Sequence, residues 1–258
     1  MLNYRNTNIL FGAITLILLV IHLRVAHLSW VVPALFLFDY SLILFYGSYF
    51  IDSAFFMPVI CKGNSGEKVV SITFDDGPVK DVTPELLDLL KAYDVKACFF
   101  CIGKNIPGNE NILKRITEEG HLVANHSYAH DFWFDLNSAS TFMEDLSDTS
   151  NLIYGATGKK PLYFRPPYGV TTPNLNKAVR KLNYSTIGWN IRTYDTISSD
   201  PGHVIKRIHK NLSPGSILLF HDRMPETVQL LRTSIDYLIN QGYKIVPLDE
   251  LIQTKPYA

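Results

Sequence analysis

Two long apolar segments occupy the N-terminal fifth of the chain. The first spans residues 9–23 and the second spans about 28–51. A helix needs about 20 apolar residues to cross the hydrocarbon core of a bilayer, and about 17 is the lower limit. The second segment is long enough, whereas the first reaches this length only if residues 2–8 extend it. With that extension the pattern predicts a hairpin of two transmembrane helices, at about residues 8–24 and 29–51, within a membrane anchor of residues 1–55.

A single span is the alternative. The first segment would then be a cleaved signal peptide or an interfacial helix, with Arg5 as the charged start of the signal. No A-x-A cleavage site follows the first segment, and the second apolar segment comes almost at once. The sequence therefore favours the hairpin.

A different pattern begins at about residue 66, where short apolar runs alternate with amphipathic segments. The apolar runs predict strands at residues 68–74, 96–102, 121–124, 162–164, 184–190, 216–220 and 243–246. Thr83, Thr172 and Asp200 each precede a proline, which is a typical helix start. Gly120 and Gly242 stand where helices should end.

This alternation of about seven strands with helices predicts an α/β domain over residues 66–258. The sheet should be parallel, and either closed as a barrel or left doubly wound. In a barrel of this kind the active site is built from the loops that follow the strands. Reactive side chains are therefore expected directly after the predicted strands.

The charge and cysteine counts narrow the function classes. The chain has 24 Lys and Arg against 24 Asp and Glu, so it lacks the positive excess typical of nucleic-acid-binding proteins. Its three cysteines are Cys61, Cys98 and Cys101. Cys98 and Cys101 are three residues apart in a predicted strand and should face opposite sides. We expect no nucleic-acid partner and no disulfide between these two.

Two adjacent carboxylates, Asp75 and Asp76, end the first predicted strand and precede a Gly-Pro turn. If both face a pocket, their like charges oppose joint ionisation unless a cation lies between them. An ordinary surface turn of sequence Asp-Asp-Gly-Pro is the alternative.

Two histidines, His126 and His130, follow the third predicted strand. Histidines four residues apart lie on one helical face or tight turn and can bind one metal ion together. The motif alone is a weak signal, but it follows a strand of the same predicted barrel. A carboxylate and two imidazoles would supply three protein ligands and leave a position open for water, as in catalytic zinc sites.

Two further strand ends carry polar groups. Arg165 begins the segment Arg-Pro-Pro-Tyr-Gly after the fourth predicted strand, and His221 follows the strand at 216–220. An arginine beside a carboxylate keeps it ionised and oriented. A surface arginine on a rigid loop is the alternative reading of the first motif.

Together these motifs resemble the NodB-homology polysaccharide deacetylase family, also called carbohydrate esterase family four. The motifs are Thr-Phe-Asp-Asp-Gly-Pro at 73–78, His-Ser-x-x-His at 126–130, Arg-Pro-Pro-Tyr-Gly at 165–169 and Leu-Leu-Phe-His-Asp at 218–222. The resemblance covers about residues 66–250. It implies a distorted seven-stranded (β/α) barrel that binds one divalent metal, usually Zn²⁺, through Asp76, His126 and His130.

The resemblance also implies catalytic roles. Asp75 would be the general base, and Arg165 would orient it. The backbone N–H of Tyr168 would help to form an oxyanion hole. His221 would be the general acid, poised by Asp195.

The sequence departs from the family at one motif. The family often has Asp-x-x-Asp-Trp after the fifth strand. Here the second aspartate is kept as Asp195, but Arg192 replaces the first and Thr196 replaces the tryptophan. The departure affects the support of Arg165 and the wall of the acetyl pocket, so we expect an altered pocket in an active enzyme.

The function implied by the resemblance is metal-dependent hydrolysis of the N-acetyl amide of amino sugars, with release of acetate. The substrate would be peptidoglycan or another cell-envelope polysaccharide. A deacylase of a lipid-linked sugar and a glycan-binding module with weakened catalysis are the alternatives. The full set of retained motifs argues against a pure binding module.

The expected location is the cytoplasmic (inner) membrane. Arg5 and Arg24 flank the first apolar segment and balance each other under the positive-inside rule. Envelope glycans lie outside this membrane, so the barrel is expected on its outer face, with the connection near residues 24–28 in the cytoplasm.

Overall fold

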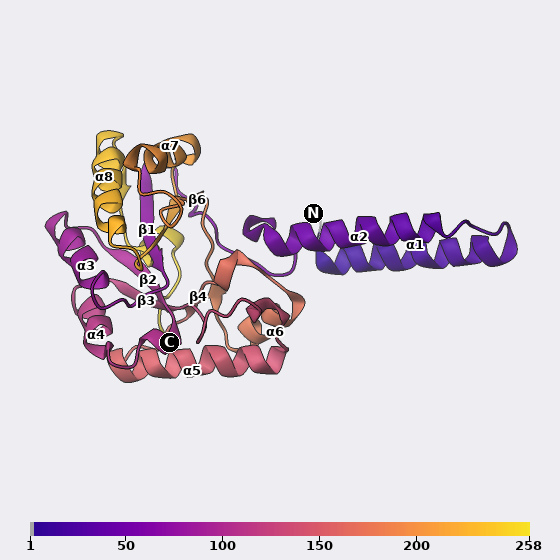
Figure 1. The fold of residues 1–258 in the computed structure, drawn as a ribbon, viewed down its shortest axis with the longest axis horizontal. Coiled ribbons are helices and arrows are strands. Elements are labelled where there is room, and N and C mark those ends of the chain that lie inside the picture. The colour runs from indigo at the N-terminus through magenta and orange to yellow at the C-terminus, as the bar shows by residue number, and fades with distance from the viewer. Residues whose placement is uncertain (1–2) are drawn as a thin grey trace.

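An N-terminal helical hairpin projects from an α/β barrel in the computed structural model, which describes residues 3–258 (Figure 1). Helix α1 comprises Tyr4–Arg24 and α2 comprises Val31–Tyr49. The Asn3 side chain caps α1 by accepting a hydrogen bond from the Asn6 N–H at 2.9 Å, so the helix begins before the first apolar run. At 1.5 Å per residue each helix is about 30 Å long. Both helices are long and apolar enough to cross a membrane.

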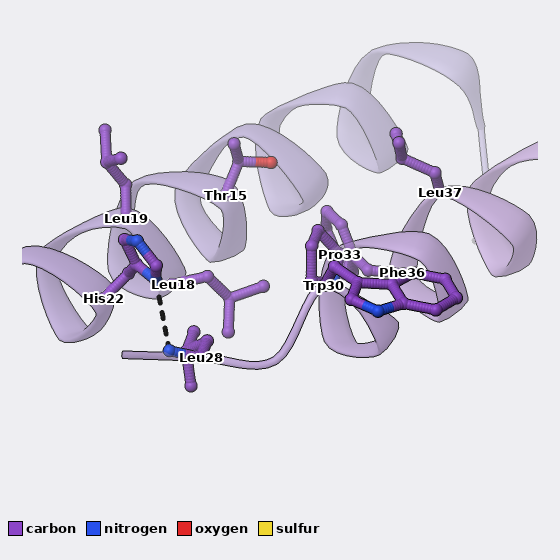
Figure 2. Close-up of a pocket in the computed structure, with 9 residues that line it drawn as sticks. All are labelled: Thr15, Leu18, Leu19, His22, Leu28, Trp30, Pro33, Phe36 and Leu37. Carbon is purple, nitrogen blue, oxygen red and sulfur yellow. Dashed lines mark hydrogen bonds between the residues drawn. The ribbon is translucent and has the colours of Figure 1, made fainter. Parts of the chain in front are cut away.

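The hairpin leaves most of its apolar side chains exposed. A cavity of about 490 Å³ opens between the two helices near their connection (Figure 2). Its lining is largely apolar, and the Nδ1 of His22 accepts a hydrogen bond from the Leu28 N–H at 3.1 Å. This cavity lies at the end of the hairpin far from the barrel, so it is separate from the site described below.

The sheet is parallel, with the strand order β5-β4-β3-β2-β1-β7-β6, and β8 pairs with β1. The strands are β1 Val69–Asp75, β2 Ala97–Cys101, β3 Leu122–Asn125, β4 Tyr163–Phe164, β5 Ser185–Thr186, β6 Ile191–Arg192, β7 Ser216–His221 and β8 Lys244–Ile245. The strands β5 and β6 end this order, so the barrel stays open between them. The predicted α/β fold with a distorted parallel barrel is confirmed.

One predicted strand is wrong in extent. The apolar run at 184–190 forms only the short strand β5, and the unpredicted strand β6 follows it, which gives eight strands where seven were expected. Between β5 and β6, Ile187 bridges Ile60, and the Gly188 N–H donates to the Ile60 carbonyl at 2.8 Å. β5 ends early because the chain near Ile60 takes the hydrogen bonds that follow it.

Helices cover the outer face of the sheet (Figure 1). They are α3 Thr83–Ala92, α4 Glu110–Glu118, α5 Ala139–Thr157, α6 Pro173–Lys181, α7 Pro201–Asn211 and α8 Glu226–Asn240, followed by the short α9 Leu248–Ile252. The strand β2 shows how the core divides. Cys98 and Phe100 belong to one buried cluster, whereas Phe99 and Cys101 pack in another. The two cysteines are therefore free and face opposite sides, as predicted.

Two of the three predicted helix caps are confirmed. Thr172 accepts a hydrogen bond from the Leu175 N–H, and Asp200 accepts one from the Gly202 N–H. The third is wrong, because Thr83 is already the first residue of α3 and lacks a capping hydrogen bond. Its hydroxyl instead donates to the Asp222 carboxylate at 2.7 Å, beneath the site.

The register of the sheet brings the predicted site residues to one edge. Asp75 pairs with His221 across β1 and β7, and Asn125 pairs with Phe164 across β3 and β4. His126 and Arg165 follow directly after these last two residues. Because parallel strands end at the same edge, all four motifs meet there.

The hairpin is attached to this edge of the barrel. The Thr171 hydroxyl donates to the Gly47 carbonyl at 3.2 Å, and the Ser48 hydroxyl donates to the Thr171 carbonyl at 2.9 Å. Thr171 lies two residues after the Arg-Pro-Pro-Tyr-Gly motif. The end of α2 is thus hydrogen-bonded beside a loop of the candidate site.

Candidate active site

Three side chains form a cluster suited to a divalent metal. Potential ligand atoms of Asp76, His126 and His130 lie within 4.8 Å of one another. The Asp76 Oδ1 is 3.6 Å from the Nε2 of each histidine, which is too long for a hydrogen bond. Two ligands about 2.0–2.1 Å from a tetrahedral zinc would be roughly 3.3 Å apart. This buried Oδ1 has no hydrogen-bond partner among the described residues, so the donor set fits a zinc-like ion.

The protonation of the cluster also suits a metal. The Nδ1–H of His126 donates to the Arg165 carbonyl at 2.8 Å, which leaves the Nε2 lone pair for a ligand. Burial, and then the charge of His126, lower the pKa of His130 to about 4, so this imidazole is neutral. Burial raises the pKa of Asp76, but the neighbouring histidines and Arg223 outweigh it and hold this pKa below its usual value. His130 and Asp76 are therefore in the forms that bind metal.

Three site residues have left-handed backbone conformations. The φ angles are +80° at Asp76, +53° at His130 and +58° at Tyr168. Non-glycine residues rarely adopt such angles, at a cost of about 1–3 kcal/mol each, and they concentrate at functional sites. The fold therefore holds these three residues in backbone conformations that they would rarely adopt in an isolated peptide.

Asp75 is held by a fully buried arginine. The Nη1 of Arg165 donates to the Asp75 Oδ1 at 2.7 Å, and its guanidinium carbon lies 4.0 Å from the centre of the Phe100 ring. The other hydrogen bonds of this guanidinium go to Thr73 Oγ1, the Ile187 carbonyl and the Gly188 carbonyl. The second carboxylate oxygen, Asp75 Oδ2, lies 3.7 Å from His126 Nε2. Asp75 therefore has one oxygen anchored and the other facing the metal cluster.

His221 and Asp195 form a hydrogen-bonded pair at the end of β7. The His221 Nδ1–H donates to Asp195 Oδ1 at 2.9 Å, and the His221 backbone N–H donates to Asp195 Oδ2 at 2.7 Å. Burial alone lowers the pKa of His221. The hydrogen bond to Asp195 and the charges of Asp195, Asp75 and Asp76 outweigh burial and raise this pKa above its usual value. A protonated imidazole is thus stabilised beside the cluster.

Tyr168 lies beside the metal cluster as well. It belongs to the short turn Pro167–Gly169, and its ring meets the His130 ring edge-on, with the ring centres 4.6 Å apart. Its ring is half exposed, so it can contact a ligand. The role of its backbone N–H in an oxyanion hole stays a prediction.

Two residues next to His221 were missed from the sequence. The Nη1 of Arg223 lies 3.3 Å from Asp76 Oδ2. Burial first, with the nearby carboxylates, raises the pKa of Asp222 to about 7. Asp222 also lies against Gly77, where an added Cβ would be 2.0 Å from its Oδ2. Their position directly after a site-bearing strand was the signal that could have identified them.

The motif that departs from the family pattern, at residues 192–196, lies on the side of the site that carries Arg192. The Arg192 guanidinium carbon lies 5.8 Å from the Trp189 ring centre and 5.3 Å from that of Tyr194. Arg165 receives its support from backbone carbonyls and from Asp75 instead. With Arg192 in place of the aspartate, each of the three guanidinium nitrogens of Arg165 still donates at least one hydrogen bond.

Comparison with known proteins agrees with this geometry. Residues 62–187 match the family model described as polysaccharide deacetylase. The chain is 34% identical over 207 residues to the peptidoglycan-N-acetylglucosamine deacetylase PgdA of Listeria monocytogenes, covering 80% of this chain but only 43% of PgdA. It is also 34% identical over 203 residues to the peptidoglycan-N-acetylmuramic acid deacetylase PdaA of Bacillus subtilis, covering 75% of this chain and 74% of PdaA.

Solved structures give the same result. The Bc1960 peptidoglycan N-acetylglucosamine deacetylase superposes with a TM-score of 0.73 at 30% identity, covering 78% of this chain and 95% of that one. A CE4 family pseudoenzyme from Bacillus anthracis superposes with a TM-score of 0.70 at 31% identity, covering 75% of this chain and 68% of that one. In sequence and in fold, the chain belongs to the polysaccharide deacetylase family.

Proposed function

We propose that this protein is a metal-dependent deacetylase that hydrolyses the N-acetyl amide of amino sugars in a cell-envelope glycan. The observation that supports this most directly is the pairing of a three-ligand cluster with Asp75 on one side and His221 on the other. The relatives named as peptidoglycan deacetylases support the glycan class.

In the proposed mechanism, Asp76, His126 and His130 hold the metal. When bound, the ion would supply positive charge that polarises the amide carbonyl and lowers the pKa of the attacking water. Asp75 accepts the proton of that water through the oxygen that Arg165 leaves free. The Tyr168 N–H donates to the developing oxyanion, an interaction typically worth about 3 kcal/mol.

The final step is departure of the amine. The acetamide C–N bond breaks and the nitrogen takes a proton from the His221 imidazolium, while Asp195 stabilises that cation. Such general acid–base transfers contribute about 10²–10⁴-fold each. The products are acetate and a free amino sugar.

We also propose that α1 and α2 anchor the enzyme in the cytoplasmic membrane as a hairpin. Both helices carry exposed apolar side chains along their length. The Tyr4 N–H donates to the Phe55 carbonyl, which places both ends of the hairpin on the barrel side. We propose that this side is extracytoplasmic, and an alkaline phosphatase fused after Ala258 should then be active.

A glycan-binding module without catalysis is the competing function, since one structural neighbour is described as a pseudoenzyme. The retained base, acid and ligand set favours catalysis. Acetate release from a panel of N-acetylated envelope glycans tests the choice. Release that a chelator abolishes and added zinc restores is expected. A protein that binds metal and glycan yet releases no acetate would be the binding module.

A further inference from the structure

A groove of about 540 Å³ lies between the barrel end of the hairpin and the active site. Residues 49–52, where α2 ends, line it on one side, and Arg192 and Arg207 line it on the other. Tyr168 also lines the groove, and its ring contacts that of His130. In Figure 1, β6 lies between β1 and the barrel end of α2. The groove therefore adjoins the metal cluster through Tyr168.

The two arginines share one aromatic ring. The guanidinium carbons of Arg192 and Arg207 lie 5.3 Å and 4.2 Å from the centre of the Tyr194 ring. Stacking on an aromatic face fixes a guanidinium and leaves its N–H donors available. Among residues 3–258, neither arginine has a carboxylate within 4.0 Å. The Arg192 Nε is buried and has no hydrogen-bond partner there.

These features select an anion. Neither guanidinium is neutralised by a carboxylate of the described chain, so an anionic ligand that accepts hydrogen bonds from both gains affinity. Planar guanidiniums match the oxygens of phosphate and carboxylate groups. Asp52 is the single carboxylate among the lining residues, and it forms no ion pair with either arginine in the described chain. Two cations against one carboxylate leave a net positive groove.

The position of the groove favours a phosphate at the membrane surface. Tyr49 is the last residue of the proposed span α2 and residues 50–52 follow it, so this side of the groove would lie where the helix leaves the bilayer. Tyr49 and Phe50 are exposed there, and aromatic side chains are enriched at the level of lipid headgroups. A phosphate that carries a lipid chain would reach this level, whereas a polymer in the wall need not approach it.

We propose that Arg192 and Arg207 bind the phosphate that links the substrate sugar to a membrane lipid. The inference rests on the proposed deacetylase function and specifies its substrate as the lipid-linked form of the glycan. The sugar would place its acetamide at the metal cluster, beside Tyr168. The phosphate would lie in the groove, with the lipid directed along the end of α2.

Acetate release by the full-length protein in lipid vesicles tests this assignment. Two probes are compared, N-acetylglucosaminyl-diphosphate linked to a polyprenol and the neutral tetramer of N-acetylglucosamine. The wild type should prefer the lipid-linked probe by about 10- to 100-fold in kcat/KM, the value of one or two charge-assisted hydrogen bonds. Arg192→Gln and Arg207→Gln should each reduce this preference at least fivefold, mainly through KM.

Arg232→Gln, which replaces an exposed arginine on α8, is the matched control and should keep the wild-type preference. Equal hydrolysis of both probes by the wild type would overturn the inference and leave the proposed function standing. So would a preference that survives in both groove variants. An oligosaccharide of N-acetylmuramic acid is the third probe. If the groove variants lose acetate release from this probe alone, the site binds a carboxylate and the lipid-linked assignment fails.

A binding measurement separates failure of the inference from failure of the proposed function. Asp75→Asn protein, with and without Arg192→Gln, is titrated with the lipid-linked probe in vesicles. Binding that weakens at least tenfold on Arg192→Gln supports the phosphate site even if no probe is hydrolysed. Equal affinity of the Asp75→Asn protein with and without Arg192→Gln overturns the phosphate site.

Discussion

The side of the site that holds Arg165 is buried, whereas the side that holds Arg192 opens to a groove. Arg165 has no exposed surface and donates to a carboxylate, a hydroxyl and two carbonyls. Arg192 stacks on aromatic rings and has no ion pair in the described chain. The first wall, which holds Arg165, carries the family motifs unchanged, and the second wall, which holds Arg192, carries the departures. In the proposed function the reaction and the choice of substrate are therefore separated: the first wall carries out the reaction and the second is available for recognition.

The largest effect on activity is expected when a proposed metal ligand of the first wall is replaced. His126→Ala or His130→Ala should lose the metal and all but a trace of activity, because each removes one of three protein ligands. Metal content by elemental analysis should fall from about one ion per chain to near zero. His209→Ala, an exposed histidine on α7, should keep both metal and turnover. Full occupancy in the His126→Ala, His130→Ala double variant would remove the site from this cluster.

The two arginines should differ sharply in stability. Arg165→Ala leaves Asp75 buried without its partner, and breaking a buried pair typically costs about 3–5 kcal/mol. Arg192→Ala should cost less than about 1 kcal/mol, because its guanidinium stacks on aromatic rings and forms no ion pair in the described chain. Urea unfolding of the two variants side by side gives the comparison. Similar losses in both would show that the second wall is as structural as the first.

Asp195→Asn should change how the rate depends on pH. Without the carboxylate, burial dominates and the pKa of His221 falls, so less of the acid is protonated at neutral pH. The alkaline limb of kcat/KM should move to lower pH, and turnover at pH 8 should drop about 10- to 100-fold. An alkaline limb that stays in place would mean that His221 is not the acid, or that Asp195 does not set its pKa.

A further effect, on stability alone, is expected outside both walls, at His121. Its Nδ1 accepts a hydrogen bond from the Ala97 N–H at 3.1 Å, and burial lowers its pKa to about 4. Between pH 6.5 and 4 the unfolded chain binds a proton that the folded chain does not, so stability falls as pH falls. This term should cost about 2 kcal/mol at pH 5 relative to pH 8. His121→Gln should unfold with about 2 kcal/mol less pH dependence over that range, and an unchanged slope would contradict the assignment.

Most of the barrel and of the first wall could be predicted from the sequence. Apolar runs located β1, β2, β3, β4 and β7 to within about a residue because these strands are buried on both faces. The side chains of Asp75, His126 and Arg165 were predictable because each lies at the end of a strand or directly after it, and the ends of parallel strands meet. The site therefore follows from local patterns and one rule of topology.

The second wall could not be predicted in the same way. The early end of β5 within the run at 184–190 depends on hydrogen bonds to the chain near Ile60, more than 120 residues earlier. The groove at Arg192 exists because the end of α2 lies opposite, where Thr171 binds Gly47 and Ser48. The use of Thr83 to hold Asp222 is also a contact between distant segments. Local sequence patterns carry no signal for such pairings.

In the proposed mechanism the adjacent carboxylates have different roles: Asp75 is the general base and Asp76 is a metal ligand. Metal content and turnover measured on the same preparations of Asp75→Asn and Asp76→Asn test it most directly. Asp75→Asn should keep about one metal ion per chain and lose about 10²–10⁴-fold in turnover, because a base is removed and no ligand is. Asp76→Asn should lose the metal itself. Loss of metal in Asp75→Asn with retention in Asp76→Asn would contradict the assignment of both residues.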